Sequence, residues 1–244
     1  MASGETHQLL CMVPCFNEGE NLPRLLEQIR AENLTQHCDL LFVDDGSVDG
    51  SAALLKESGF AVHVHPTNAG YGAAIKSGLR YARERGYLHL GVFPGDGQRC
   101  VSDMVALFRE AEKGSFDLVV GSKLHLLRTI PWRRAVGNRL FSRFARVLGR
   151  APFSDVLSGF KVYRVASVLP LLDWLPDRYD FDLVFAIHCG RAGFSVREIP
   201  VDVRYHAHST KMKSVTAEGL RMLSSSLKTL YGRGVRPIED PLGE

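Results

Sequence analysis

The sequence predicts an α/β protein built on a mainly parallel sheet flanked by helices. Short apolar runs alternate with amphipathic stretches through residue 121, which is the pattern of repeated strand–helix units. The runs are almost continuously apolar, as expected for strands that are buried on both faces. Acidic or glycine-rich turns follow several of them, at the positions where ligands bind in such sheets.

Five apolar runs in the first half predict strands. These are expected at 9–14, 40–43, 61–64, 88–93 and 117–121, with helices at 22–31, 50–58, 73–85 and 104–113. Pro14 is expected to end the first strand. Since parallel strands end at a common edge, the polar residues that follow them are expected along one rim of the sheet: Asn17, Glu18, Asp44, Asp45 and Asp96.

The pattern changes after residue 122. An amphipathic helix is expected at 131–150, a compact segment at 155–165, a helix at 181–192, a strand at 195–201 and a last helix at 214–231. The tail from residue 232 is expected to be loose. No stretch has the composition of a linker, so we expect one domain over residues 1–244.

Composition excludes several classes of function. The formal net charge of the 244-residue chain is only +3, which is too small to indicate a nucleic-acid-binding protein. The five cysteines form no CxxC pair, so free thiols in a reducing compartment are expected rather than disulfides or a zinc ribbon. The N-terminus lacks a basic region, and no apolar stretch approaches 18 residues, so we expect a cytoplasmic protein.

One turn stands out as a candidate site. Phe93-Pro94-Gly95-Asp96-Gly97-Gln98 follows the fourth apolar run, and its Pro-Gly break leaves the Asp96 carboxylate at the end of a buried strand. Taken alone, an aspartate in such a turn is more often a turn former than a ligand. Its interpretation depends on the other strand ends.

Four further motifs accompany this turn: Val13-Pro14-Cys15-Phe16-Asn17-Glu18, Val43-Asp44-Asp45-Gly46-Ser47, Gly70-Tyr71-Gly72-Ala73-Ala74 and Asp155-x-x-Ser158-Gly159-Phe160-Lys161. With them the chain resembles glycosyltransferase family 2 over about residues 9–213, and within it the polyprenyl-phosphate (dolichyl-phosphate) mannose and glucose synthases. The resemblance implies a GT-A fold and inverting transfer of a hexose from a nucleotide sugar of the GDP-mannose or UDP-glucose type to a polyprenyl phosphate. It assigns about 8–121 to nucleotide-sugar binding and about 122–231 to acceptor binding.

The resemblance places the donor at the strand ends. Carboxylates can accept hydrogen bonds from base N–H groups and ribose hydroxyls, and Glu18 with Asp44 or Asp45 matches the family positions that do so. Helix capping is the alternative for Asp45 and Ser47, and a simple turn is the alternative for Gly70 and Gly72. The implied donor set is Pro14, Phe16, Asn17, Glu18, Asp44, Asp45, Gly70, Gly72 and Asp96.

Asp96 matches the second carboxylate of the family's DxD metal motif, and Pro94 replaces the first. Mg²⁺ typically uses only one or two protein carboxylates when phosphate and water supply the other ligands. The resemblance therefore implies Mg²⁺ or Mn²⁺ on Asp96 and Gln98. Pro94 also leaves open a non-catalytic module that binds nucleotide sugars.

A phosphate acceptor calls for cations rather than a base, because a phosphate monoester with a second pKa of about 6 is already anionic at neutral pH. Arginine and lysine clamp phosphoryl oxygens. Lys123 stands where the family commonly has Arg. In the loop at 206–211, only Ser209 and Lys211 match the family's Arg-x-x-Gly-x-Ser-Lys pattern. The implied acceptor set is Lys123, Arg134 (or Arg133), Arg139, Ser158, Lys161, Ser209 and Lys211, and the catalytic set is Asp96, Asp155 and Lys123.

Two alternatives concern the acceptor side. A soluble hydroxyl acceptor, such as a glycan or natural-product intermediate, would need a carboxylate base: Asp155, Asp180 or Asp182, of which Asp155 is favoured. The helix of residues 131–150 carries arginines and no acid, so it can lie in an anionic lipid interface or be a solvated helix packed on the sheet. We therefore expect peripheral contact with the inner face of a membrane, or with a membrane partner.

Overall fold

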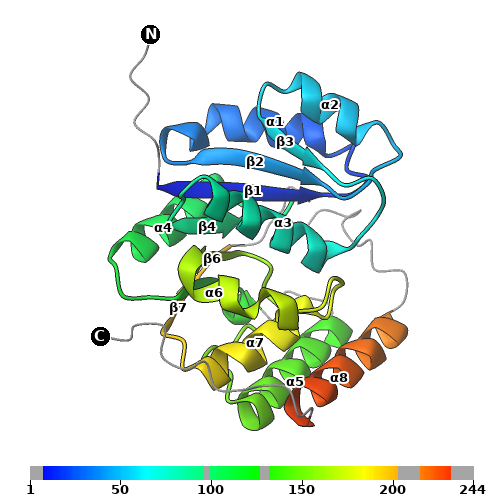
Figure 1. Ribbon diagram of the computed structural model, residues 1–244, viewed down its shortest axis with the longest axis vertical. Helices are drawn as coiled ribbons and strands as arrows, with labels where there is room; N and C mark the ends of the chain where they lie inside the picture. The colour runs from blue at the N-terminus through cyan, green and yellow to red at the C-terminus, as the bar shows by residue number, and fades with distance from the viewer. Residues whose placement is uncertain (1–7, 96–98, 127–131, 203–214, 232–244) are drawn as a thin grey trace.

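The computed structural model describes residues 8–95, 99–126, 132–202 and 215–231. For residues 126, 132–136, 138, 215–218 and 220 it describes only the backbone. Its centre is one seven-stranded sheet in the order β3-β2-β1-β4-β6-β5-β7 (Figure 1). Neighbouring strands are parallel except where β6 meets β4 and β5. The expected mainly parallel sheet is confirmed. Its strands are β1 (Leu9–Cys15), β2 (Asp39–Asp44), β3 (Ala61–Val64), β4 (His89–Val92), β5 (Leu118–Ser122), β6 (Lys161–Arg164) and β7 (Val196–Pro200).

The antiparallel strand β6 brings a turn to the edge where the other strands end. Lys161, the first residue of β6, pairs with Val92 at the end of β4 and with Val120 near the end of β5. Residues 155–160, which precede β6, therefore lie at the carboxyl edge of the parallel strands. Only a compact segment was expected here, because the strand has four residues and α6 follows it directly, with no turn residue to mark its end.

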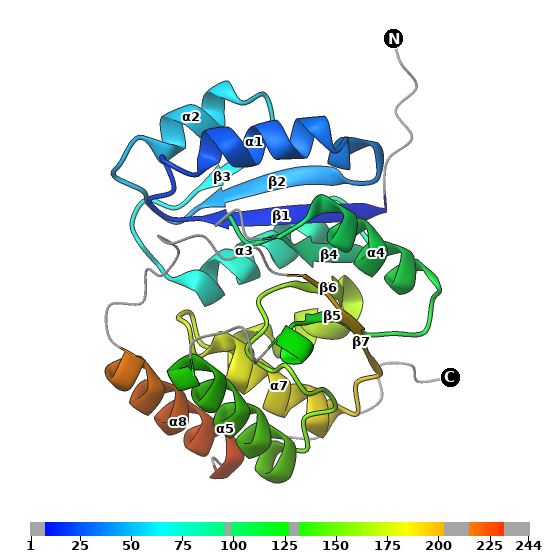
Figure 2. The same cartoon turned by 180° about the vertical axis from the view of Figure 1, so that it is seen from behind.

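Helices cover both faces of the sheet (Figures 1 and 2). One face carries α1 (Leu22–Ala31), α2 (Ser51–Glu57) and α4 (Val101–Glu112); the other carries α3 (Tyr71–Glu84), α6 (Val165–Val168) and α7 (Phe181–Ala192). Helices α5 (Trp132–Gly149) and α8 (Val215–Tyr231) form an outer layer on α7. Three short 3₁₀ helices are η1 (Leu34–Gln36), η2 (Leu124–Leu126) and η3 (Leu169–Trp174).

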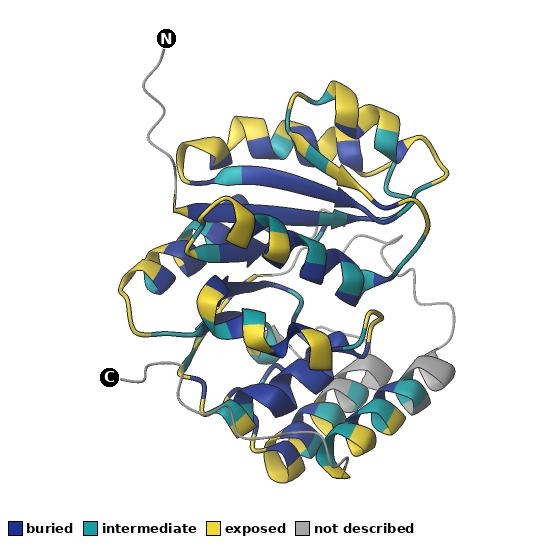
Figure 3. Ribbon diagram, in the orientation of Figure 1, coloured by how far each residue is buried: buried dark blue, intermediate teal, exposed yellow. Residues whose placement is uncertain are grey.

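The strands feed two cores, because successive side chains of a strand point to opposite faces. In β1, Leu10 and Met12 join the core that α3 and α7 cover, whereas Cys11 and Val13 join the core that α1 and α4 cover. The inner strands β1, β2, β4 and β5 are accordingly almost entirely buried, whereas the edge strands β3 and β7 are partly exposed (Figure 3). All five cysteines are free thiols, as expected.

Pro14 does not end β1, which continues to Cys15. Pairing with β4 stops at Met12, so Pro14 has a strand neighbour only in Val43 of β2. A proline is tolerated where one side of the strand is open, because its missing N–H then removes no ladder bond.

Candidate active site

The loops after β1 and β2 form one hydrogen-bonded unit at the carboxyl edge of the sheet. The backbone N–H of Asn17 donates to Ser47 Oγ (2.8 Å), and the Asn17 side-chain oxygen accepts from the N–H of Val48 (2.9 Å). Asn17 has a φ of 53°, a left-handed conformation that asparagine tolerates better than most residues. Glu18 donates its N–H to Ser51 Oγ (2.9 Å), and its carboxylate accepts from the Asn21 side chain (2.6 Å).

The two aspartates at the end of β2 have different partners. Asp44 is buried and accepts from its neighbour Ser47, through the hydroxyl (2.5 Å) and through the backbone N–H (3.2 Å). Asp45 accepts from the backbone N–H groups of Ala69 (2.9 Å) and Gly70 (2.8 Å). The N-terminal N–H of helix α2 is bound by Asp49, which accepts from Ser51 (3.0 Å), so the capping role considered for Asp45 is not found. Asp45 instead fixes the glycine-containing loop before α3.

His65 completes this contact and was missed by the sequence analysis. Its Nδ1 lies 2.7 Å from Asp45 Oδ1, and its Nε2 lies 2.9 Å from Ser77 Oγ. The ring is buried at the end of β3, where it joins the loop after β2 to helix α3. No spacing in the sequence relates residues 45, 65 and 77, so only the fold shows this connection.

Gly70 and Gly72 allow another part of the chain to approach closely. A Cβ at Gly72 would overlap the carbonyl oxygen of Pro176, and one at Gly70, whose φ is +113°, would overlap that of Asp177. The N–H of Ala73 donates to that Asp177 oxygen (3.0 Å). The close approach at these glycines is therefore to the segment 176–178 of the second half.

Two cations strengthen the same junction between the halves. The buried Lys76 of α3 donates to the carbonyl of Leu175 and lies 2.7 Å from a carboxylate oxygen of Asp177. Arg178 donates to the side-chain oxygen of Asn68 (2.6 Å). None of these residues was expected at the site, since a lysine within an amphipathic helix is usually solvated.

Asp155 and Ser158 lie in the turn before β6, and both are fully buried. Asp155 Oδ2 accepts the backbone N–H of Lys123 (2.9 Å), and the Ser158 hydroxyl donates to the carbonyl of Gly121 (2.7 Å). The Glu198 carboxylate of β7 accepts the N–H of Asp155 (3.0 Å). These contacts hold the turn against the end of β5, and thereby fix the backbone of Lys123.

Lys161 is placed differently from the expectation that it contacts an acceptor phosphate. Its ammonium has no exposure to solvent and lies 2.7 Å from Asp182 Oδ1. Burial raises the pKa of Asp182, although the Lys161 charge draws it down. Burial and the nearby Asp182 also raise the pKa of Tyr71, whose ring packs against Phe181. Lys161 thus belongs to the core below the rim.

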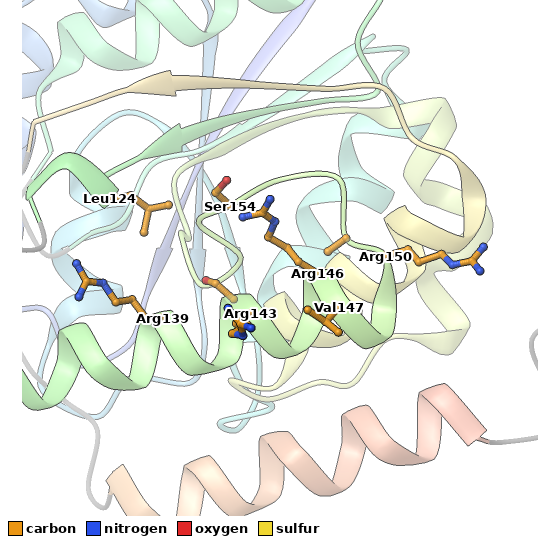
Figure 4. Close-up of a pocket in the computed structure, with 9 residues that line it drawn as sticks. Leu124, Arg139, Arg143, Arg146, Val147, Arg150 and Ser154 are labelled. Atoms are coloured by element: carbon orange, nitrogen blue, oxygen red, sulfur yellow. The ribbon is translucent and has the colours of Figure 1, made fainter.

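A pocket of about 870 Å³ lies along α5, beside Ser154, which directly precedes the turn of residues 155–160 (Figure 4). Its walls come from η2, from α5 and from the chain after α5. Of the expected acceptor residues, Arg139 lines it and Lys123 does not. Arg134 lies in α5, but its side chain, like Ser209 and Lys211, falls outside the described part of the chain. The lining residues are Leu124, Arg139, Ser142, Arg143, Arg146, Val147, Arg150, Ala151 and Ser154.

The expected metal ligands Asp96 and Gln98 also lie outside the described residues. Gly95, directly before them, packs against the end of β1, where an added Cβ would lie 2.9 Å from the Pro14 carbonyl oxygen. Among the described residues no group of three or more His, Cys, Asp or Glu could hold a metal ion. Within the same ranges, no helix combines the length and the apolar character that crossing a membrane requires.

Known proteins resemble the chain in sequence and in fold. A family model described as glycosyl transferase family 2 matches residues 11–168. Polyprenol monophosphomannose synthase of Mycolicibacterium smegmatis is 33% identical to this chain, in an alignment that covers 80% of this chain and 77% of the relative. Undecaprenyl-phosphate mannosyltransferase of Micrococcus luteus is 28% identical, in an alignment that covers 80% of this chain and 82% of the relative. The structure of glucosyl-3-phosphoglycerate synthase from Mycobacterium tuberculosis with Mn²⁺ and UDP-glucose has a TM-score of 0.70 at 17% identity, over 93% and 80%.

Proposed function

The chain belongs to glycosyl transferase family 2, and from that premise we propose that it transfers a hexose, with inversion, from a nucleotide sugar to a polyprenyl phosphate. The observation that carries the proposal is the common rim: the loops after β1 and β2 face the same edge as Lys123 and the turn 155–160. The names of the two sequence relatives support a polyprenyl-phosphate acceptor and a mannose donor.

We assign the donor to the unit of loops after β1 and β2. Pro14, Phe16, Asn17 and Glu18 would contact the nucleotide, with Asp44 beneath them at the end of β2. Asp45, Gly70 and Gly72 would act by positioning, since their contacts are made to the protein itself. The nucleotide-sugar half of about 8–121 and the acceptor half of about 122–231 would then meet at the junction of Lys76 and Arg178.

Asp96 and Gln98 would hold a divalent cation, Mg²⁺ or Mn²⁺. A carboxylate and an amide oxygen suit a hard cation that also takes phosphate oxygens and water. Gly95 fixes the start of this segment beside Pro14, and so at the donor edge. When bound, the cation would neutralise charge on the departing diphosphate.

An oxygen of the acceptor phosphate would attack the anomeric carbon from the face opposite the leaving group. The new bond joins that carbon to the phosphate oxygen, and the bond to the diphosphate oxygen breaks, so the nucleoside diphosphate leaves with the electron pair. No proton has to be removed, because the phosphate is already anionic. Lys123 would hold its oxygens as a cation, and Ser209 and Lys211 would join it from the loop at 206–211.

A soluble hydroxyl acceptor fits the geometry less well. It would need a base, yet Asp155 is fully buried and holds the Lys123 backbone. Asp182 is paired with Lys161, and Asp180 accepts from Ser225 (2.6 Å). A role for any of these carboxylates as base would require the turn or α7 to move.

Incubation with labelled GDP-mannose or UDP-glucose, polyprenyl phosphate and Mg²⁺ tests the proposal. We expect label in the lipid fraction with one donor, and the opposite anomeric configuration in the product by NMR. Turnover on a soluble alcohol without transfer to lipid would contradict the lipid acceptor. Donor binding without turnover on any acceptor would indicate a non-catalytic module.

A further inference from the structure

Three arginines form one stripe along α5, and a fourth follows the helix directly. Arg139, Arg143 and Arg146 come at intervals of four and three residues, the spacing that keeps side chains on one face of a helix, and Arg150 comes just after the last helical residue, Gly149. At a rise of about 1.5 Å per residue the helical part of the stripe is about 10 Å long. All four side chains are exposed and line the same pocket.

No carboxylate balances this charge within the described residues, because none of the ion pairs there includes any of the four arginines. Like charges three and four residues apart repel one another on a helix. Planar guanidinium groups bind phosphoryl oxygens through paired hydrogen bonds. A bound anion would therefore reduce the repulsion between the arginines and accept hydrogen bonds from their guanidinium groups.

Ser142 gives an independent indication of a ligand. Its side chain is 7% exposed, it lines the pocket, and its hydroxyl has no hydrogen-bond partner within the described residues. A buried hydroxyl without a partner is costly, since it has lost water and gained nothing in return. Arg139 and Arg146 stand three residues before and four after Ser142, so the three residues share one face of the helix, and all three line the pocket.

We propose that this pocket is a phosphoryl-binding subsite in which Ser142, Arg143 and Arg146 hold a phosphate group, with Arg139 and Arg150 at its two ends. The site is additional to the proposed transfer, which needs one phosphate at Lys123, a residue that does not line the pocket. Its ligand is a phosphoryl group, carried by a lipid headgroup or free in solution. Val147 in the wall and Leu140 beside it are 65% and 63% exposed, and such apolar side chains suit a headgroup at a bilayer surface.

Calorimetric titration of the full chain with inorganic phosphate tests the subsite. The variant Arg143→Gln/Arg146→Gln should weaken binding at least tenfold, and Ser142→Ala severalfold. The matched control Arg80→Gln/Arg83→Gln removes the same charge from exposed positions of α3 and should change affinity less than twofold. Equal weakening by the stripe variant and the control would overturn the proposal, because the effect would then be one of net charge.

Sedimentation with vesicles separates the two sources of the phosphoryl group. Loss of binding to vesicles of phosphatidylcholine with phosphatidylglycerol in the stripe variant, with no binding to pure phosphatidylcholine, identifies a headgroup. Phosphate binding that the stripe variant weakens, with vesicle binding unchanged, identifies free phosphate. If the parent chain binds neither probe, the subsite does not exist.

Protection of the parent chain from phenylglyoxal, mapped by mass spectrometry, needs no variant. Phosphate or vesicles should slow modification of Arg143 and Arg146 and leave Arg80 unaffected. Uniform modification of all three residues in the presence of either probe would contradict the proposal. None of these measurements uses donor or transfer, so failure of the transfer assay and failure of the subsite are distinguishable.

Discussion

The ammonium of Lys161 lies 2.7 Å from a carboxylate oxygen of Asp182, in a setting where the two side chains are 0% and 10% exposed. The pair ties the first residue of β6 to the first turn of α7. The rings of Phe153 and Phe185 lie 5.6 and 5.8 Å from the same ammonium and enclose it. A lysine that the motif suggested as an acceptor contact therefore holds β6 and α7 together.

Lys161→Met should lower the free energy of unfolding by about 3–5 kcal/mol, because it leaves the Asp182 carboxylate buried without its partner. Urea denaturation measures the loss. The double variant Lys161→Met/Asp182→Leu should recover most of it, since both charges are then gone. Unchanged stability with weaker acceptor binding would return Lys161 to the acceptor site.

Asp45→Asn should destabilise the protein by about 1–3 kcal/mol, since the NH₂ group that replaces one carboxylate oxygen cannot accept a hydrogen bond, which leaves the N–H of Ala69 or of Gly70 without its partner. Donor affinity should fall with it, because the loop at 69–70 loses its anchor. Asp49→Asn is the control: Asp49 accepts from Gly19 and Ser51, but it is exposed, so water can replace a lost bond and the destabilisation should be smaller. Equal effects of the two variants, in denaturation and donor titration, would contradict the positioning role.

Gly72→Ala should lower the free energy of unfolding by about 1–3 kcal/mol, because the alanine methyl group would overlap the Pro176 carbonyl and push the segment 176–178 away. Gly137→Ala in α5 is the matched control. No described atom lies within 4 Å of that site, and alanine should stabilise the helix by about 0.5–1 kcal/mol. Thermal unfolding should show opposite shifts, and a neutral Gly72→Ala would mean that the junction is loose.

Asp96→Ala should weaken Mn²⁺-dependent donor binding by more than tenfold, and EDTA should do the same to the parent chain. The reason is that the remaining predicted ligand, Gln98, carries no charge to hold a divalent cation. Asp173→Ala, at an exposed position in η3, is the control. Donor affinity that is equal in parent and Asp96→Ala would remove Asp96 from the site.

His188 should make stability depend on pH. Burial is the main cause that lowers the pKa of this α7 histidine from 6.5 to about 4. The unfolded chain then binds the proton more readily, so stability is fully present above about pH 6.5 and is lost as the pH falls toward 4. At about 1.4 kcal/mol per pKa unit the loss reaches at most about 3 kcal/mol. Urea midpoints at pH 7 and pH 5 should differ in the parent and in the control His63→Gln, and should converge in His188→Leu.

The sequence predicted most of the fold because most elements carry their own signal. Helices α1 and α7 and strand β3 match the expected bounds. Helix α1 has a clear helical period, and the other two are apolar segments that end near Gly193 and Pro66. Strand β6 lacks such an end, because α6 follows it directly. The consequence of its reversal, that residues 155–160 reach the rim, could not be read from local pattern.

The site was predictable in its composition but less so in its roles. The motif residues that the structure describes do gather at one edge, as strand ends must. Several of them nevertheless make their contacts within the protein: Asp45, Gly72, Ser158 and Lys161. A sequence motif cannot distinguish such contacts from contacts to a ligand. His65, Lys76 and Arg178 were missed because their partners lie far away in the sequence.

The sheet order also has a consequence for synthesis on the ribosome. Strands β1 to β4 are complete at residue 92, and β6, which covers the free side of β4, begins at residue 161. At about 5–20 residues per second, the backbone of β4 stays unpaired on that side for roughly 3 to 14 seconds. An uncovered strand edge is a template for pairing with other chains. The nascent chain therefore passes through an interval of exposure to aggregation that ends only when its one reversed strand emerges.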